Sequence, residues 1–164
     1  MVIEEGDEWD MKKFFAYNWQ VRDEWFKWCQ QLTSSQLLKE MGGGAGSILY
    51  TLFHIVEVEN SWIRGIQGKE DMVYSFDDYA TLDKVVSLSN RLKQDHKHFI
   101  DCELLQLNEK MIQVPWETNA YTCDDIIHHI IVHEIHHIGQ LSIWARRLDL
   151  SPIPAHFVGR ELSH

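Results

Sequence analysis

The chain has 164 residues and no break in composition, which predicts a single domain over 1–164 with one hydrophobic core. Its 25 acidic residues outnumber 15 basic ones and give a net charge of −10, so binding to nucleic acid or to an anionic membrane is disfavoured. Three cysteines without C-x-x-C spacing, no signal-peptide pattern and no apolar run of about 20 residues predict a cytoplasmic protein without disulfides, cysteine-based zinc sites or membrane spans.

The first half of the chain contains two segments with helical periodicity. Apolar residues recur at three- and four-residue steps over 10–32, and the polar residues 33–35 are predicted to end this first helix. The glycine-rich stretch 42–46 has no preceding strand and no following Gly-Lys-Ser/Thr, so we interpret it as a flexible connector and not as a phosphate-binding loop. A second helix is predicted over 47–66.

The second half contains two further helical segments separated by a loop. The third helix is predicted to run from residue 77 or 78 to about residue 105, and the loop 110–121 is expected to be extended, with at most a short hairpin. Thr122 precedes two acidic residues and indicates an N-cap, so a fourth helix is predicted to run from there to about Leu148. Four helices of roughly 20 to 28 residues predict an all-α fold, a four-helix bundle.

The last predicted helix places its histidines on different faces. At about 100° per residue, one stripe faces the core and contains Ile126, Ile130, His133, His137, Gln140 and Trp144. His133 and His137 are four residues apart, so their imidazoles can hold one cation together. His128 lies nearly opposite this stripe, whereas His129 and His136 lie on its flank.

The apolar surface of the same helix is wider than one bundle interior requires. The residues that widen it are Ile127, Ile131, Ile138 and Ala145. We therefore predict a second contact surface, most simply a homodimer, and expect these side chains to be buried by a partner chain or by the connecting loops.

A third ligand is available on the predicted second helix, where His54 is the lone histidine. Its neighbours on the helical wheel are mostly small or hydroxyl residues, including Ser47, Tyr50, Thr51, Ser61 and Gly65. Such a stripe is interpreted as the lining of a polar cavity. Three imidazoles from two facing helices would leave coordination positions open for water or substrate, so we predict that His54, His133 and His137 bind one divalent metal ion.

Residues 133–137 also satisfy the H-E-x-x-H pattern, in which the glutamate is the general base of a zinc peptidase. The extended form of that pattern fails, because Gln140 and Ile143 stand where a glycine and a third histidine are expected. A metal-dependent hydrolase that uses Glu134 is therefore the least favoured of the functions considered.

Two segments, GGGAGSILYTLFHIVEVENSW and YTCDDIIHHIIVHEIHHIGQL, resemble the DinB/YfiT-like superfamily of metal-binding four-helix bundles, and the resemblance covers nearly the whole chain. In that family one histidine of the second helix and an H-x-x-x-H pair of the last helix bind a divalent metal. These positions match His54, His133 and His137 here. The family's Gly-Gln after the pair is present as Gly139-Gln140, and Tyr17-Asn18-Trp19 is typical of its first helix.

The resemblance implies a chemistry, because relatives include maleylpyruvate isomerases that use mycothiol and transferases that join bacillithiol to electrophiles. A metal would accept a low-molecular-weight thiol, lower its pKa and present the thiolate to a small-molecule substrate. The alternative is a metal-stabilised bundle without turnover. Three imidazoles suit several metals, and zinc or nickel is expected before iron. No catalytic residue is predicted beyond the three ligands.

Overall fold

The computed structural model describes residues 5–107 and 109–162, and within them the chain is mainly helical. The α-helices are α1 (Glu5–Cys29), α2 (Ser34–Leu38), α3 (Ile48–Ile66), α4 (Leu82–Cys102) and α5 (Cys123–Arg147). Two 3-10 turns, η1 (Phe76–Tyr79) and η2 (Leu104–Leu107), flank α4, and two short strands, β1 (Met111–Ile112) and β2 (Tyr121–Thr122), precede α5.

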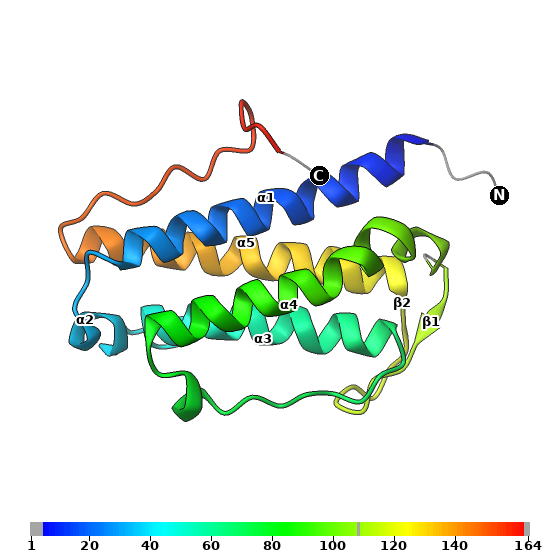
Figure 1. Cartoon of the computed structure of the whole chain (residues 1–164), viewed down its shortest axis with the longest axis horizontal. Coiled ribbons are helices and arrows are strands. Elements are labelled where there is room, and N and C mark those ends of the chain that lie inside the picture. Colours follow the sequence, from blue (N-terminus) through cyan, green and yellow to red (C-terminus); the bar gives the residue numbers. More distant parts are fainter. Residues whose placement is uncertain (1–4, 108, 163–164) are drawn as a thin grey trace.

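The four long helices α1, α3, α4 and α5 pack as a bundle, which confirms the predicted all-α fold (Figure 1). α1 and α5 run in one direction and α3 and α4 in the opposite one, because segment 67–81 returns along the outside of the bundle before α4 begins (Figure 1). The two helices that carry the predicted ligands, α3 and α5, pack directly against each other. None of the described helices has an apolar stretch that could traverse a bilayer.

Side-chain caps fix the starts of the two ligand-bearing helices. The Ser47 hydroxyl accepts a hydrogen bond from the backbone N–H of Tyr50, and the Thr122 hydroxyl accepts one from the backbone N–H of Asp125. Each bond satisfies a helix-terminal donor that has no partner inside the helix. Both starts agree with the sequence predictions.

Other boundaries were predicted wrongly. The first helix was predicted over 10–32 but runs from Glu5 to Cys29, and residues 33–35 instead begin α2, because the Thr33 side chain and Gln36 form a reciprocal capping box. The third helix starts at Leu82 and not at 77 or 78, since Phe76–Tyr79 form η1. This turn places the rings of Phe76 and Tyr79 5.3 and 5.8 Å from that of Phe53, so aromatic packing replaces the expected first turn.

The apolar residues that widen α5 are buried within the chain itself. Ile127, Ile131 and Ile138 are only 2%, 5% and 5% exposed, and Ala145 is fully buried. The broad apolar surface therefore packs in the interior of one bundle and is not evidence for a homodimer. The homodimer itself stays a prediction. α5 instead exposes the apolar side chains Val132, Ile135 and Ile143.

The loop before α5 forms the short hairpin that the sequence allows. Met111 pairs with Thr122, and Ile112 with Tyr121. The loop also packs on α3 at Gly65, where an added Cβ would lie only 2.6 Å from Cγ1 of Val114. A glycine at this position thus lets Val114 reach the helix surface, which fixes the loop beside α3.

Candidate metal centre

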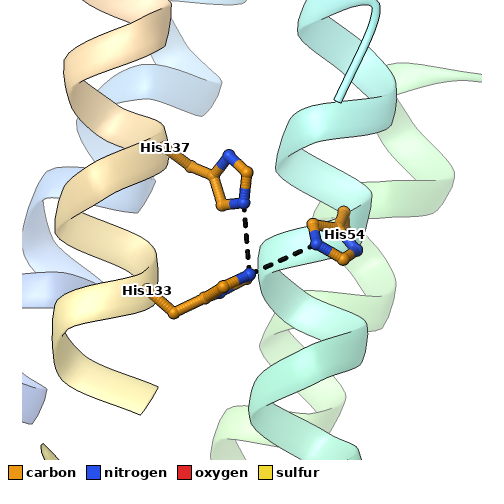
Figure 2. Close-up of side chains that lie close together, drawn as sticks. All are labelled: His54, His133 and His137. Carbon is orange, nitrogen blue, oxygen red and sulfur yellow. Dashed lines mark hydrogen bonds between the residues drawn. The ribbon is translucent and has the colours of Figure 1, made fainter. Parts of the chain in front are cut away.

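The three predicted ligands meet between α3 and α5 (Figure 2). His54 extends from α3 toward His133 and His137, which lie one turn apart on α5. Nε2 of His133 is 3.2 Å from Nε2 of His54 and 3.1 Å from Nε2 of His137. The candidate ligand atoms all lie within 4.8 Å of one another, so the three side chains could hold one metal ion.

These distances fit a small first-row cation. Zn–N bonds of about 2.0–2.1 Å in tetrahedral geometry put two nitrogens roughly 3.3 Å apart. The His133–His54 and His133–His137 separations of 3.2 and 3.1 Å are close to that value. Three neutral nitrogen ligands leave at least one position of a tetrahedral ion for water or substrate.

Burial keeps the pair on α5 in the form that binds metal. Burial and, after it, the neighbouring imidazoles His137 and His54 together lower the pKa of His133 to about 3. Burial also lowers the pKa of His137, and the hydrogen bond that its ring donates to Gln140 partly offsets this shift. At neutral pH both imidazoles are therefore neutral, with a lone pair free for a cation.

Gln140 orients His137. Its Oε1 lies 2.8 Å from Nδ1 of His137, so the ring donates its Nδ1 proton to the amide and keeps the Nε2 lone pair for the centre. The glycine-rich connector packs on the same amide, since a Cβ at Gly44 would lie 2.5 Å from Oε1 of Gln140. The connector therefore also covers one side of the centre.

The centre is open on the side of His54. The His54 side chain is 29% exposed, and its Nδ1 lies 3.7 Å from a carboxylate oxygen of Glu57. Its ring stacks on that of Tyr50, with 6.2 Å between centroids. An external molecule can therefore approach the three nitrogens from this side.

The other histidines stay outside the centre. His128 and His136 are exposed, and His128 lies 3.4 Å from a carboxylate oxygen of Asp124. His96 is only 4% exposed, and one of its ring nitrogens lies 3.0 Å from Oδ1 of Asn60. The amide of Asn60 thus gives the ring a polar partner inside the bundle.

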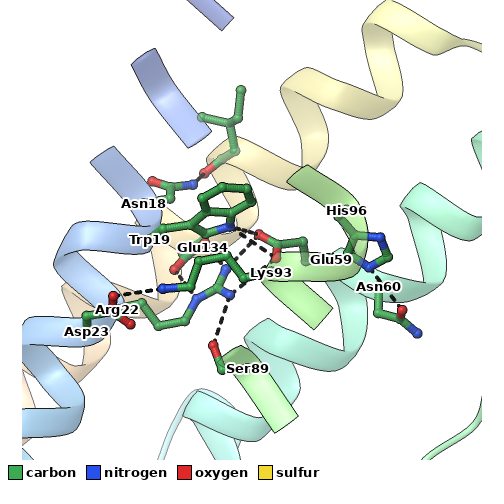
Figure 3. Close-up of polar contacts among 11 residues, drawn as sticks. Asn18, Trp19, Arg22, Asp23, Glu59, Asn60, Ser89, Lys93, His96 and Glu134 are labelled. Carbon is green, nitrogen blue, oxygen red and sulfur yellow. Dashed lines mark hydrogen bonds and ion pairs between the residues drawn. The ribbon is translucent and has the colours of Figure 1, made fainter. Parts of the chain in front are cut away.

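Glu134 belongs to a different cluster, which it forms with the buried residues Arg22 and Glu59 (Figure 3). Its two carboxylate oxygens accept hydrogen bonds from Nε and Nη2 of Arg22 at 2.8 and 2.6 Å. Burial raises the pKa of the Glu134 carboxyl, and the Arg22 guanidinium opposes that shift. A carboxylate held in this way cannot act as the base of an H-E-x-x-H peptidase, which must reach water on the metal.

Arg22 also binds Glu59 of α3, with donor–acceptor distances of 2.7 and 3.2 Å, and it reaches Oγ of Ser89 at 3.5 Å. The indole N–H of Trp19 donates to both oxygens of Glu59. Neither Arg22 nor Glu59 was predicted from the sequence. A signal was present, because Arg22 stands three residues before Trp25 on the core-facing side of the predicted helix, where an arginine needs a buried partner.

Cys123, Trp19 and Trp25 have structural environments and lie outside the centre. Burial raises the pKa of Cys123 to about 11, so it is a thiol at neutral pH. Trp25 is fully buried in the hydrophobic core, and the indole N–H of Trp19 donates a hydrogen bond to Glu59. Trp62, however, lines a cavity that adjoins the centre.

Comparison with known proteins gives two matches over most of the chain. A family model described as the DinB family matches residues 6–163. The protein YizA of Bacillus subtilis strain 168, which is itself uncharacterized, is 59% identical over 153 residues that span 93% of this chain and 96% of YizA.

Proposed function

Because the chain belongs to the DinB family, we propose that it is a metal-dependent enzyme that transfers a low-molecular-weight thiol to an electrophilic small molecule. His54, His133 and His137 would hold one divalent cation, and zinc or nickel is the ion that we expect. The cation supplies one property, since coordination lowers the pKa of a thiol and yields a thiolate at neutral pH.

One observation carries this proposal. Three imidazole nitrogens converge within 4.8 Å from two helices, and the His54 side is partly exposed. A structural zinc site is usually closed by a fourth protein ligand, whereas an open position suits a substrate. No fourth histidine, cysteine or carboxylate joins the cluster among the described residues.

The residues of the chain have separate tasks in this reaction. His137 is held by Gln140 with its Nε2 directed into the centre, and the connector around Gly44 covers that side. The exposed face of His54 admits the thiol. The thiol proton leaves to solvent, and the sulfur forms a bond to the electrophilic carbon, whose leaving group departs with its electron pair.

The test uses cobalt as a spectroscopic probe. Purified protein is analysed for bound elements, exchanged with Co²⁺ and titrated with mercaptoethanol. We expect one metal per chain and a sulfur-to-cobalt charge-transfer band that saturates with thiol, followed by thiol consumption when an alkyl halide or epoxide is added. If metal removal only lowers the melting temperature and no thiol band appears, the bundle is metal-stabilised without turnover.

A further inference from the structure

A cavity of about 240 Å³ opens beside the histidine centre, where α3 and α5 meet the loop before α5. Its lining residues are Trp62, Glu117, Tyr121, Asp125, Ile126 and His129. His129 connects the two sites, because its ring centroid lies 5.6 Å from that of Trp62 and 5.9 Å from that of His133. Since His129 and His133 are one helical turn apart, the cavity begins about 6 Å along α5 from the centre.

The outer wall of the cavity is held in place by packing. Val114 lies against Gly65 of α3, and the ring of Trp116 meets that of Trp62 edge-on, with 5.5 Å between centroids. The side-chain amide of Gln113 donates a 2.7 Å hydrogen bond to the backbone carbonyl of Glu117. These contacts fix the segment that carries Glu117 before any ligand arrives, which lowers the entropic cost of binding.

The lining has the charge and surface of a site for an organic cation. Glu117 and Asp125 contribute carboxylates, and none of the described lining residues is a lysine or arginine. Trp62 and Tyr121 contribute aromatic rings, whose faces attract cations. An anionic group would meet two carboxylates here in a chain of net charge −10 and is therefore disfavoured.

We propose that this cavity binds the ammonium end of an aminothiol whose sulfur reaches the histidine centre. The inference rests on the proposed function and adds the class of thiol that the site selects. The ammonium group lies between Glu117 and the ring of Trp62, and the chain of the molecule passes His129 toward His133.

The test compares three thiols of equal length that differ only at the far end: aminohexanethiol, mercaptohexanol and mercaptohexanoate. Each is titrated into the cobalt-loaded protein, and the charge-transfer band gives its dissociation constant. We expect the ammonium compound to bind about tenfold or more tightly than the alcohol, and the carboxylate most weakly. Equal dissociation constants for the three compounds would overturn the inference while leaving the proposed function intact.

A matched pair of variants separates the cavity from the general negative charge of the protein. Glu117→Gln should remove most of the preference for the ammonium thiol and leave the dissociation constant of the alcohol unchanged. Asp124→Asn removes the same charge from the first turn of α5, but Asp124 faces His128 and does not line the cavity. It should retain the preference. An equal loss in both variants would show that only long-range charge attracts the ligand and would refute the cavity.

The same titration distinguishes failure of the two proposals. If none of the three thiols produces a band in a protein with one cobalt per chain, the thiol function and the aminothiol inference both fall. If all three produce a band without selection, only the aminothiol inference falls. Circular dichroism of each variant confirms that the bundle is folded before the constants are compared.

Discussion

The histidine centre and the Arg22 cluster both join α3 to α5, but they satisfy their polar groups in opposite ways. Arg22 donates five hydrogen bonds, and its partners Glu59 and Glu134 are 3% and 1% exposed. At the centre, ring nitrogens of His54 and His133 face each other, and both side chains are partly exposed. Unpaired buried polar groups are costly. In the Arg22 cluster the protein itself provides the partners, whereas the three histidines of the centre could share one metal ion.

The two clusters are neighbours in sequence, which makes the comparison useful. His133 and Glu134 are adjacent, but successive residues of a helix point about 100° apart, so one reaches the open centre and the other the closed cluster. The H-E-x-x-H pattern, which treats both residues as parts of one catalytic site, therefore does not describe this protein, because the two side chains point to different sites. The comparison predicts that changes in the closed cluster alter stability, whereas changes in the open centre alter metal binding.

Arg22→Met should have the largest effect. It leaves two buried carboxylates without their cation, and we expect the free energy of unfolding in urea to fall by about 3–5 kcal/mol. Lys93→Met is the control, because its ion pair with Asp23 is partly exposed and should contribute less than about 1 kcal/mol. Similar losses in the two variants would contradict the structural role of the cluster.

Replacing the whole cluster sharpens this result. Buried ion networks are often neutral or unfavourable relative to apolar residues of similar volume. The triple variant Arg22→Met, Glu59→Leu, Glu134→Leu should therefore recover most of the stability that the single change loses, as measured in the same urea titration. A triple variant less stable than Arg22→Met would mean that the hydrogen bonds themselves provide the stability.

His133→Ala should abolish stoichiometric metal binding, because Nε2 of His133 lies between the Nε2 atoms of the other two ligands, 3.2 Å from that of His54 and 3.1 Å from that of His137. In the wild-type protein, zinc at about 100 times its dissociation constant should add roughly 2.7 kcal/mol to the unfolding free energy. The variant should show no such gain, whereas His128→Ala should behave as wild type. Calorimetry with and without zinc measures this gain in unfolding free energy for each variant. An equal loss of the gain in His133→Ala and His128→Ala would disprove the assigned ligand set.

Gln140→Met should weaken zinc binding by about 10–100-fold, since it removes the acceptor that orients His137. Competition with a chromophoric chelator gives the dissociation constant. Gln140→Glu keeps an acceptor oxygen for the Nδ1 proton of His137 and should lose less. An unchanged constant in Gln140→Met would show that the helix alone orients the ring.

The smallest effect concerns His96, a histidine that is buried and already hydrogen-bonded. Burial lowers its pKa in the folded state, so the unfolded chain takes up a proton first as the pH falls below the ordinary value of about 6.5. His96 therefore destabilises the fold progressively below that pH. His96→Gln should flatten the fall of the unfolding free energy between pH 7 and pH 5 by up to about 1 kcal/mol. An identical pH profile in both proteins would refute this contribution.

Much of this arrangement could be predicted from the sequence, because local signals specify it. The caps Ser47 and Thr122 mark the helix starts, and the four-residue spacing of His133 and His137 places them on one face. Spacing within one helix says nothing about the neighbouring helix, so His54 was predicted from its small and hydroxyl neighbours and from the need of the pair for a third ligand, and the resemblance to a known family supported that choice.

What could not be predicted depends on contacts distant in sequence. Arg22 donates its five hydrogen bonds to residues of three other helices, and the sequence around Arg22 indicates that it needs a partner but not which residues provide one. The same holds for Ile131, whose burial was predicted to come from a partner chain or from the connecting loops, because the wheel of one helix does not count the neighbours that the rest of the bundle provides. The η1 turn was missed because aromatic packing on Phe53 overrides local helix propensity.

The pairing of the first long helix with the last has a consequence for the protein during its synthesis. Arg22 and Glu134 are 112 residues apart, so α1, α3 and α4 are synthesised before the second carboxylate exists. Until α5 is present, α3 lacks one of the helices that bury its apolar side, and transiently exposed apolar surface favours aggregation. Folding therefore waits for the last helix, and a ribosome that stops before α5 releases a chain without a stable core.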